Sequence, residues 1–253
     1  MKAFGNISYG EHKDNLLDIY LPDCEEFPVY VHFHGGGMES GDKGDVSNPD
    51  SFVEAKYLTD NGIAVVSANY RMYPHAAYPD FIRDSAAAVA WTKNNIQNYG
   101  KCTKIFVGGS SAGGYLSMML CFDKKWLAPY FIDPAELGGF IHDAGQPTVH
   151  FNVLRERGVD SRKAVIDDAA PLYHIGESEK YPPMKFIVAD DDMPARYEQT
   201  MLTLATLKHF GYDMSDIEHE VMHGTHTWYG GIIDDQGISI YGKLIGDFIK
   251  KYC

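Results

Sequence analysis

The sequence predicts an α/β fold, with a mostly parallel central sheet and helices on both faces of that sheet. Strand-like and helix-like segments alternate along most of the 253 residues. The run 63–68 is continuously apolar, which is typical of a strand covered on both faces. A further strand-like run, 104–107, leads through a glycine-rich turn into an apolar helical segment. Together these observations favour a sheet enclosed by helices.

The other elements continue the alternation. Residues 16–21 alternate in polarity and end before Pro22, so we expect an early antiparallel strand at an edge of the sheet. Further strands are predicted over 29–34, 140–144, 185–189 and 217–222, and helices over 80–98, 196–210 and 238–251. We find no internal repeat and expect a single domain over 1–253. Its least regular stretch, 122–182, is predicted to be either a small cap or lid insertion or a set of ordinary connections.

Composition and charge exclude several functions. The net charge of −13 argues against nucleic acid or an anionic membrane as a partner, because both require clustered Lys and Arg. No apolar run approaches the roughly 20 residues that span a bilayer, and the first residues lack the apolar core of a signal peptide. The four cysteines show no metal-binding or disulfide spacing. We therefore expect a cytoplasmic protein with free thiols.

The sequence Gly109-Ser110-Ser111-Ala112-Gly113 has the pattern G-x-S-x-G between a predicted strand and a predicted helix. In that context the pattern predicts a nucleophile elbow, a sharp turn that exposes the central serine hydroxyl. Serine is a weak nucleophile by itself, so a base, an orienting acid and an oxyanion hole must accompany it.

A second glycine run, His34-Gly35-Gly36-Gly37, follows the predicted strand 29–34. Glycines allow backbone N–H groups to approach a substrate oxygen closely. We expect this loop and the N–H of Ala112 to form the oxyanion hole that the elbow requires.

The base and the acid are expected after the last two strands. Among 11 histidines, His226 is preferred because it lies in a predicted loop after 217–222, whereas His219 lies inside that strand and His223 at its end. The acid is expected in the run Asp190-Asp191-Asp192, with Asp192 preferred. The contiguous aspartates lack the spacing of a calcium loop, so no metal is expected.

These motifs resemble the α/β-hydrolase superfamily, and within it the HGGG-bearing branch of esterases and lipases. That branch includes carboxylesterases and acetyl-xylan and feruloyl esterase-like enzymes. The resemblance extends from residue 17 to the final helix and includes the segments 69–71 and 78–84. It implies an α/β-hydrolase fold, with Ser111, Asp192 and His226 as the triad. It also implies oxyanion donors at Gly35, Gly36 and Ala112.

The expected function is hydrolysis of small carboxylic esters through an acyl-enzyme, without a cofactor. Short acyl groups are favoured. Acetylated or feruloylated carbohydrates are expected as substrates only on the basis of the resemblance. An amidase, formamidase or peptidase with the same triad is the alternative, and a non-catalytic binding protein with the hydrolase fold is a further one. Arg71 is expected to form a structural ion pair with Asp84 rather than to bind a substrate carboxylate. Trp228 and Tyr229 are equally suited to line a pocket or to pack in the core.

Overall fold

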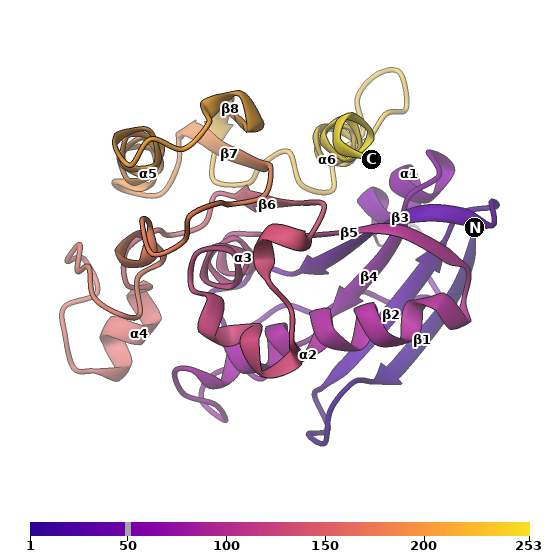
Figure 1. Cartoon of the computed structure of the whole chain (residues 1–253), viewed down its shortest axis with the longest axis horizontal. Coiled ribbons are helices and arrows are strands. Elements are labelled where there is room, and N and C mark those ends of the chain that lie inside the picture. Colours follow the sequence, from indigo (N-terminus) through magenta and orange to yellow (C-terminus); the bar gives the residue numbers. More distant parts are fainter. Residues whose placement is uncertain (49–51) are drawn as a thin grey trace.

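One eight-stranded sheet forms the centre of the computed structural model, which describes residues 1–48 and 52–253 (Figure 1). The spatial order of its strands is β1-β2-β4-β3-β5-β6-β7-β8. Their bounds are β1 Lys2–Ser8, β2 Leu16–Leu21, β3 Glu26–Phe33, β4 Ala64–Ala68, β5 Lys101–Ser110, β6 Gly139–Asp143, β7 Met184–Asp191 and β8 Ile217–Thr225. Pairing is antiparallel from β1 to β4 and parallel from β4 to β8.

Helices cover both faces of the sheet, as predicted. They are α1 Val53–Asp60, α2 Asp80–Asn95, α3 Ala112–Phe122, α4 Phe151–Glu156, α5 Arg196–His209 and α6 Ile240–Tyr252. Helices α1 and α6 lie together on one face, and α2 and α3 lie on the other (Figure 1). Neighbouring residues of a strand therefore enter different cores: Val66 packs with α2 and α3, and Val65 packs with α1 and α6. Such full burial stabilises the fold by roughly 1.5–3 kcal/mol per large apolar side chain.

The edge-strand prediction for 16–21 is wrong. Strand β2 is antiparallel, but it lies between β1 and β4, and β1 forms the edge. The sequence of β1 contains a glycine and an asparagine and shows no clear alternation of polar and apolar residues that would identify a strand. Helix α1 and the short α4 were not predicted from the sequence. Helix α2 ends at Asn95 and continues as a 3₁₀ turn, Ile96–Asn98, instead of reaching residue 98 as α-helix.

The parallel strands bring distant segments of the chain together along the side of the sheet where their carboxyl ends lie. The carboxyl ends of β3, β5, β6, β7 and β8 all open on this edge, where ligands bind in open α/β sheets. Strands β7 and β8 continue to Asp191 and Thr225, beyond the bounds expected from the sequence. As a result the loops carrying Asp192 and His226 leave neighbouring strands side by side.

The stretch 122–182 contains β6, α4 and several 3₁₀ turns. Many hydrogen bonds attach it to the rest of the protein. Among them, Tyr115 donates its hydroxyl to Ala169 O (2.7 Å), and Asn152 donates its amide to Gly37 O (2.5 Å). The second bond places α4 directly against the glycine loop. Within the described residues, no helix combines the length and the apolar character needed to cross a membrane.

Candidate active site

Ser111 occupies a strained turn between β5 and α3. Its backbone φ of 56° and ψ of −110° are unusual for a residue with a side chain. Two backbone hydrogen bonds hold it there: Ser111 N donates to Asp143 O (2.8 Å), and Tyr115 N donates to Ser111 O (3.0 Å). A Cβ on Gly113 would lie 1.9 Å from Phe33 O, so glycine is required where α3 meets the end of β3. The turn therefore has the geometry that the sequence motif predicts.

The structure brings Ser111, His226 and Asp192 together. His226 Nε2 lies 2.9 Å from Ser111 Oγ, and His226 Nδ1 lies 2.6 Å from Asp192 Oδ1. An ionised carboxylate only accepts hydrogen bonds, so Nδ1 carries the proton and Nε2 is free to accept one from the serine. The Asp192 side chain is fully buried, and that of His226 is 23% exposed. The three residues thus form a continuous hydrogen-bonded chain from the interior to the surface.

Asp192 is held as a carboxylate. Burial raises its pKa, but the hydrogen bond and charge of His226 and two backbone N–H groups outweigh burial, so the pKa lies below its ordinary value. These N–H groups belong to Met193 (2.7 Å) and Ala189 (3.3 Å). The carboxylate is therefore charged and fixed in orientation at neutral pH.

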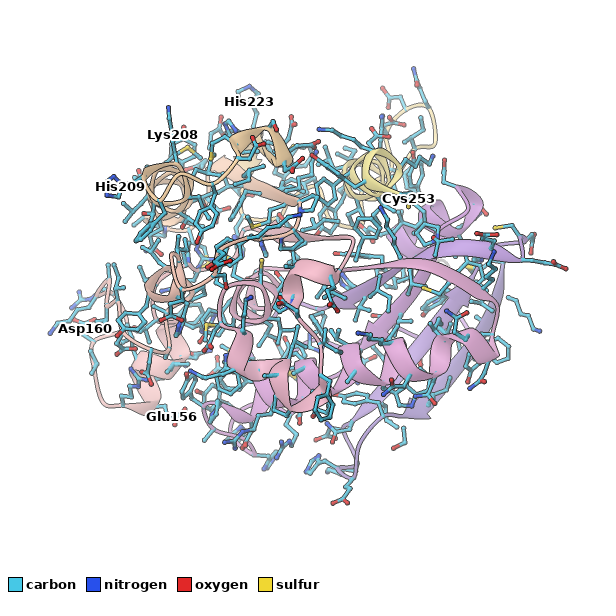
Figure 2. The ribbon with its side chains drawn as sticks, viewed as in Figure 1. Glu156, Asp160, Lys208, His209, His223 and Cys253 are labelled. Atoms are coloured by element: carbon cyan, nitrogen blue, oxygen red, sulfur yellow. The ribbon has the colours of Figure 1, made fainter. Side chains whose placement is uncertain are left out.

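A second aspartate–histidine pair lies nearby and does not reach Ser111. His223 Nδ1 is 2.5 Å from Asp190 Oδ2, and the His223 side chain is 95% exposed. Figure 2 shows His223 projecting outward from the rim of the molecule above β8. His219, the other competing histidine, is exposed on β8. The two rejected histidines and the rejected acid Asp190 therefore lie on the surface.

The glycine loop after β3 lies against the elbow. A Cβ on Gly35 would be 3.1 Å from Ser110 O and 3.3 Å from Ser111 Cβ, so the two segments are closely packed here. His34 anchors the loop: its ring stacks on Tyr70 at 4.5 Å, and the Tyr70 hydroxyl donates to His34 O (2.8 Å). Burial lowers the pKa of His34, which keeps the ring neutral at pH 7. The N–H of Ala112, in the first turn of α3, has no partner within that helix because it precedes the first helical hydrogen bond.

Asp143 is a buried carboxyl at this edge that the sequence analysis did not single out. It ends β6, is 1% exposed, and accepts a hydrogen bond from the hydroxyl of the fully buried Tyr229. Burial raises its pKa to about 6, although the hydroxyls of Ser110 and Tyr229 and the charge of His226 lower it. The signal in the sequence was an aspartate at the end of an otherwise buried strand.

We expect Asp143 to make stability depend on pH. Its folded pKa of about 6 exceeds the ordinary 3.8. Between pH 4 and 6 the unfolded chain therefore loses this proton first, and the folded state loses stability as pH rises. With 1.36 kcal/mol per pKa unit, the loss is about 3 kcal/mol. In urea unfolding, the free energy of unfolding of the wild type should fall relative to that of Asp143→Asn by this amount between pH 4 and pH 7. A difference independent of pH would contradict the assignment.

Arg71 forms the predicted ion pair. Its guanidinium contacts both carboxylate oxygens of the buried Asp84, with Nε and Nη2 each 2.8 Å away. Arg71→Met should lower the free energy of unfolding by about 2 kcal/mol or more, because Asp84 keeps a buried charge without its cation. Thermal unfolding measures this loss, and kcat on an ester substrate should stay unchanged. A selective loss of binding to carboxylate-bearing substrates, with stability retained, would instead support substrate recognition.

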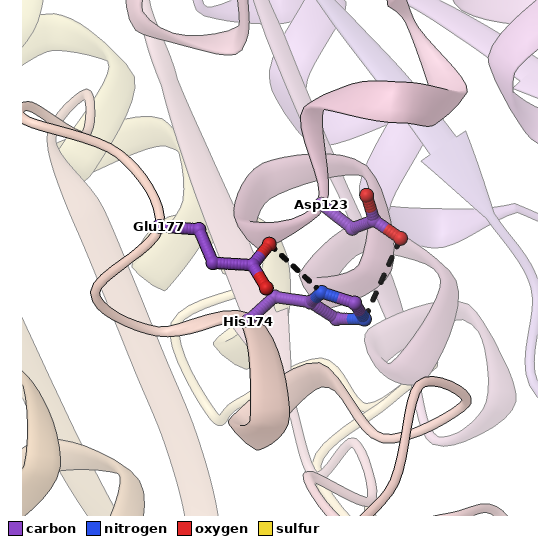
Figure 3. A group of neighbouring side chains, drawn as sticks. All are labelled: Asp123, His174 and Glu177. Carbon is purple, nitrogen blue, oxygen red and sulfur yellow. Dashed lines mark hydrogen bonds and ion pairs between the residues drawn. The ribbon is translucent and has the colours of Figure 1, made fainter.

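Asp123, His174 and Glu177 form the candidate metal cluster among the described residues (Figure 3). The two carboxylates lie at opposite nitrogens of the imidazole: Glu177 is 3.0 Å from Nδ1 and Asp123 is 3.4 Å from Nε2. Nε2 is also 3.0 Å from Asp168 O, and Lys125 Nζ is 2.6 Å from Asp123. An ion on either nitrogen would displace one of these contacts. The cluster is therefore better explained as a hydrogen-bonded link between α3 and 168–177 than as a metal centre.

A cavity of about 330 Å³ lies beside the acid loop. Its lining includes Gln146, Phe151, Lys163, Met193, Ala195 and Arg196. Phe151 also lies against the glycine loop, because a Cβ on Gly37 would be 3.5 Å from its ring. Phe151 therefore both lines this cavity and packs against the glycine loop.

Comparison with known proteins shows similarity to esterases over part of the chain. The profile of the BD-FAE family matches residues 17–129. The probable carboxylic ester hydrolase LipM of Mycobacterium tuberculosis is 37% identical over 121 residues, 46% of this chain and 27% of LipM. Carboxylesterase NlhH of the same species is 33% identical over 163 residues, 58% of this chain and 50% of NlhH. The chain therefore spans half or less of the length of these relatives.

Solved esterase structures share the fold of this chain. The structure of Thermogutta terrifontis esterase 2 phosphorylated by paraoxon has a TM-score of 0.73 to this chain, with 20% identity over 98% of this chain and 94% of that one. The chain therefore has the α/β-hydrolase fold. In sequence, part of the chain is similar to carboxylic ester hydrolases, and its fold is that of solved esterase structures.

Proposed function

We propose that this protein is a serine hydrolase of small carboxylic esters, with Ser111, His226 and Asp192 as its triad. The observation that carries the proposal is the unbroken hydrogen-bonded chain from Ser111 Oγ through His226 to Asp192, at 2.9 and 2.6 Å. Serine and histidine are within the distance that proton transfer requires. The esterase names of the relatives support the same reaction class.

The reaction proceeds in two acyl-transfer steps. His226 Nε2 accepts the Ser111 proton as Oγ attacks the ester carbonyl, and Asp192 stabilises the resulting imidazolium. The carbonyl oxygen becomes an anion between the N–H groups of Gly35, Gly36 and Ala112. His226 then donates its proton to the leaving alcohol. A water molecule, activated by the same histidine, releases the acid and restores Ser111.

The cavity beside the acid loop receives part of the ester in this proposal. Its volume of about 330 Å³ suits a short acyl or small alcohol group, and Phe151 supplies an apolar wall next to the glycine loop. Acetylated or feruloylated carbohydrates are substrates to test first, because the BD-FAE match covers the part of the chain with the glycine loop and elbow. We take 1–253 as one domain, with 122–182 as a fixed wall of the site.

A substrate panel tests the proposal. We expect p-nitrophenyl acetate and butyrate to be hydrolysed, and kcat/KM for them to exceed that for the matching p-nitroanilides by a factor of about 10² or more. Acetylated xylo-oligosaccharides and methyl ferulate extend the panel to carbohydrate-derived esters. Faster turnover of anilides or formamides would favour the amidase alternative. Absence of all turnover by a folded protein would favour a binding function.

A further inference from the structure

A buried tyrosine–carboxyl pair lies directly behind the three residues of the site. The Tyr229 hydroxyl donates to Asp143 Oδ1, and both side chains are buried. Tyr229 follows His226 by three residues and belongs to the same turn after β8. Asp143, at the end of β6, also accepts the backbone N–H of Ser111 through its own carbonyl (2.8 Å). A single residue therefore contacts the segment that carries the serine and the segment that carries the histidine.

We propose that Tyr229 and Asp143 are positioning residues, which hold the His226 loop at its working distance from Ser111. This inference rests on the proposed function. Two backbone bonds of the turn run between its own residues, Trp228 N to Thr225 O and Gly230 N to Thr227 O. Further along, Gly231 N donates to Glu54 Oε1 (2.6 Å), which ties the end of the turn to α1 rather than to the strands of the site. The Tyr229 hydroxyl connects that turn to a different strand.

Burying this pair costs free energy of folding. Burial penalises the Asp143 carboxylate, and its buried Oδ2 has no hydrogen-bond partner among the described residues. A phenylalanine and an apolar residue of similar size would fill the same space without that penalty. Tyr229 already packs among aromatic side chains, with Tyr241 at 5.8 Å, so its ring needs no hydroxyl to be buried. The hydrogen bond between Tyr229 and Asp143 is therefore better explained by positioning of the His226 loop than by a gain in stability.

Charged groups from several elements surround Asp143. The charges of His226 and Asp192 act on Asp143, and Arg196 is close enough to interact with it. The nearby Tyr30 and Tyr241 are buried and stay neutral, because burial raises the pKa of each. Because its charge depends on this whole set, the test relies on the hydrogen bond rather than on titration. A misplacement of about 1 Å at a reacting group can cost up to about 10²-fold in rate, so loss of one positioning bond should be measurable in kcat.

Tyr229→Phe is the direct test, with Tyr181→Phe as its matched control. Tyr181 is also buried and donates its hydroxyl to His174 O (3.1 Å), but it contacts no part of the proposed triad. We expect Tyr229→Phe to lower kcat on p-nitrophenyl acetate by about tenfold with KM nearly unchanged, and to slow phosphonylation of Ser111 by a fluorophosphonate by the same factor. Tyr181→Phe should leave both rates unchanged even where its melting temperature falls.

Variants of Asp143 provide the second arm. Asp143→Asn keeps an oxygen that can accept from Tyr229, so it should retain most of kcat, whereas Asp143→Leu should match Tyr229→Phe. The double variant Asp143→Leu/Tyr229→Phe should be no slower than either single variant, because both remove the same bond. Equal kcat for Tyr229→Phe and Tyr181→Phe in an active wild-type background overturns the inference. A wild type that neither hydrolyses esters nor reacts with the fluorophosphonate overturns the proposed function instead.

Discussion

Ser111→Ala should abolish ester hydrolysis, with kcat falling on the order of 10⁵-fold. Alanine has no hydroxyl to attack the carbonyl, and the glycine loop with Ala112 could then stabilise only a direct attack by water. Steady-state kinetics on p-nitrophenyl acetate measure the loss. Circular dichroism should show an intact fold, because the backbone bonds of residue 111 to Asp143 and Tyr115 do not involve its side chain.

The neighbouring Ser110 is the control for this change. Ser110→Ala removes a hydroxyl one residue away, next to the same turn, and should retain most of the wild-type kcat. Loss of activity in Ser110→Ala together with full activity in Ser111→Ala would mean that the G-x-S-x-G pattern does not mark the nucleophile here.

Asp192→Asn should reduce kcat by about 10⁴-fold with little change in stability. The amide NH₂ would face His226 Nδ1, so the histidine would carry its proton on Nε2 and could not accept the serine proton. The remaining oxygen, in the position of Oδ2, would still accept from Ala189 N, whereas Met193 N would lose the acceptor that Oδ1 provides. One backbone bond would therefore still hold the loop. The measurement is kcat and kcat/KM on a short p-nitrophenyl ester.

The exposed pair Asp190–His223 supplies the matched control. Asp190→Asn makes the same chemical change two residues away, in an aspartate that also bonds a histidine. Its kcat should stay within about twofold of wild type, as is usual for surface changes away from the site. If Asp190→Asn or Asp191→Asn were the inactive variant, the proposed acid would be wrong.

The serine turn was predictable because its signal is local. Glycines at 109 and 113 and the flanking apolar runs determine a strand, a turn and a helix within about a dozen residues, and the structure has that turn. The fold class followed from the same kind of local pattern, and it is confirmed. The catalytic roles of Ser111, Asp192 and His226 remain predictions for the experiments above.

The acid and the base required knowledge of the sheet. Asp190, Asp191 and Asp192 are adjacent in sequence, but β7 continues through Asp191, and only Asp192 lies in the turn that faces His226. The extension of β8 to Thr225 similarly leaves His223 within the strand and exposed. These bounds depend on pairing between β7 and β8, which no single segment of sequence encodes.

Two features had no usable local signal. The edge strand β1 is held by pairing with β2 and has a weak strand pattern of its own. The contact between Asp143 and Tyr229 joins residues 86 positions apart, on β6 and in the turn after β8. Until the strand order is known, Asp143 is one charged residue in an apolar strand and Tyr229 is one aromatic residue beside a histidine.

Covalent labelling tests the central claim most directly. The full chain is incubated with paraoxon or a fluorophosphonate, digested, and the adduct located by peptide mass spectrometry. We predict a single phosphoryl or phosphonyl adduct on Ser111, loss of esterase activity in proportion to labelling, and no adduct on Ser111→Ala. An adduct on a different residue that tracks the loss of activity, or full activity in a protein labelled at Ser111, would contradict the account.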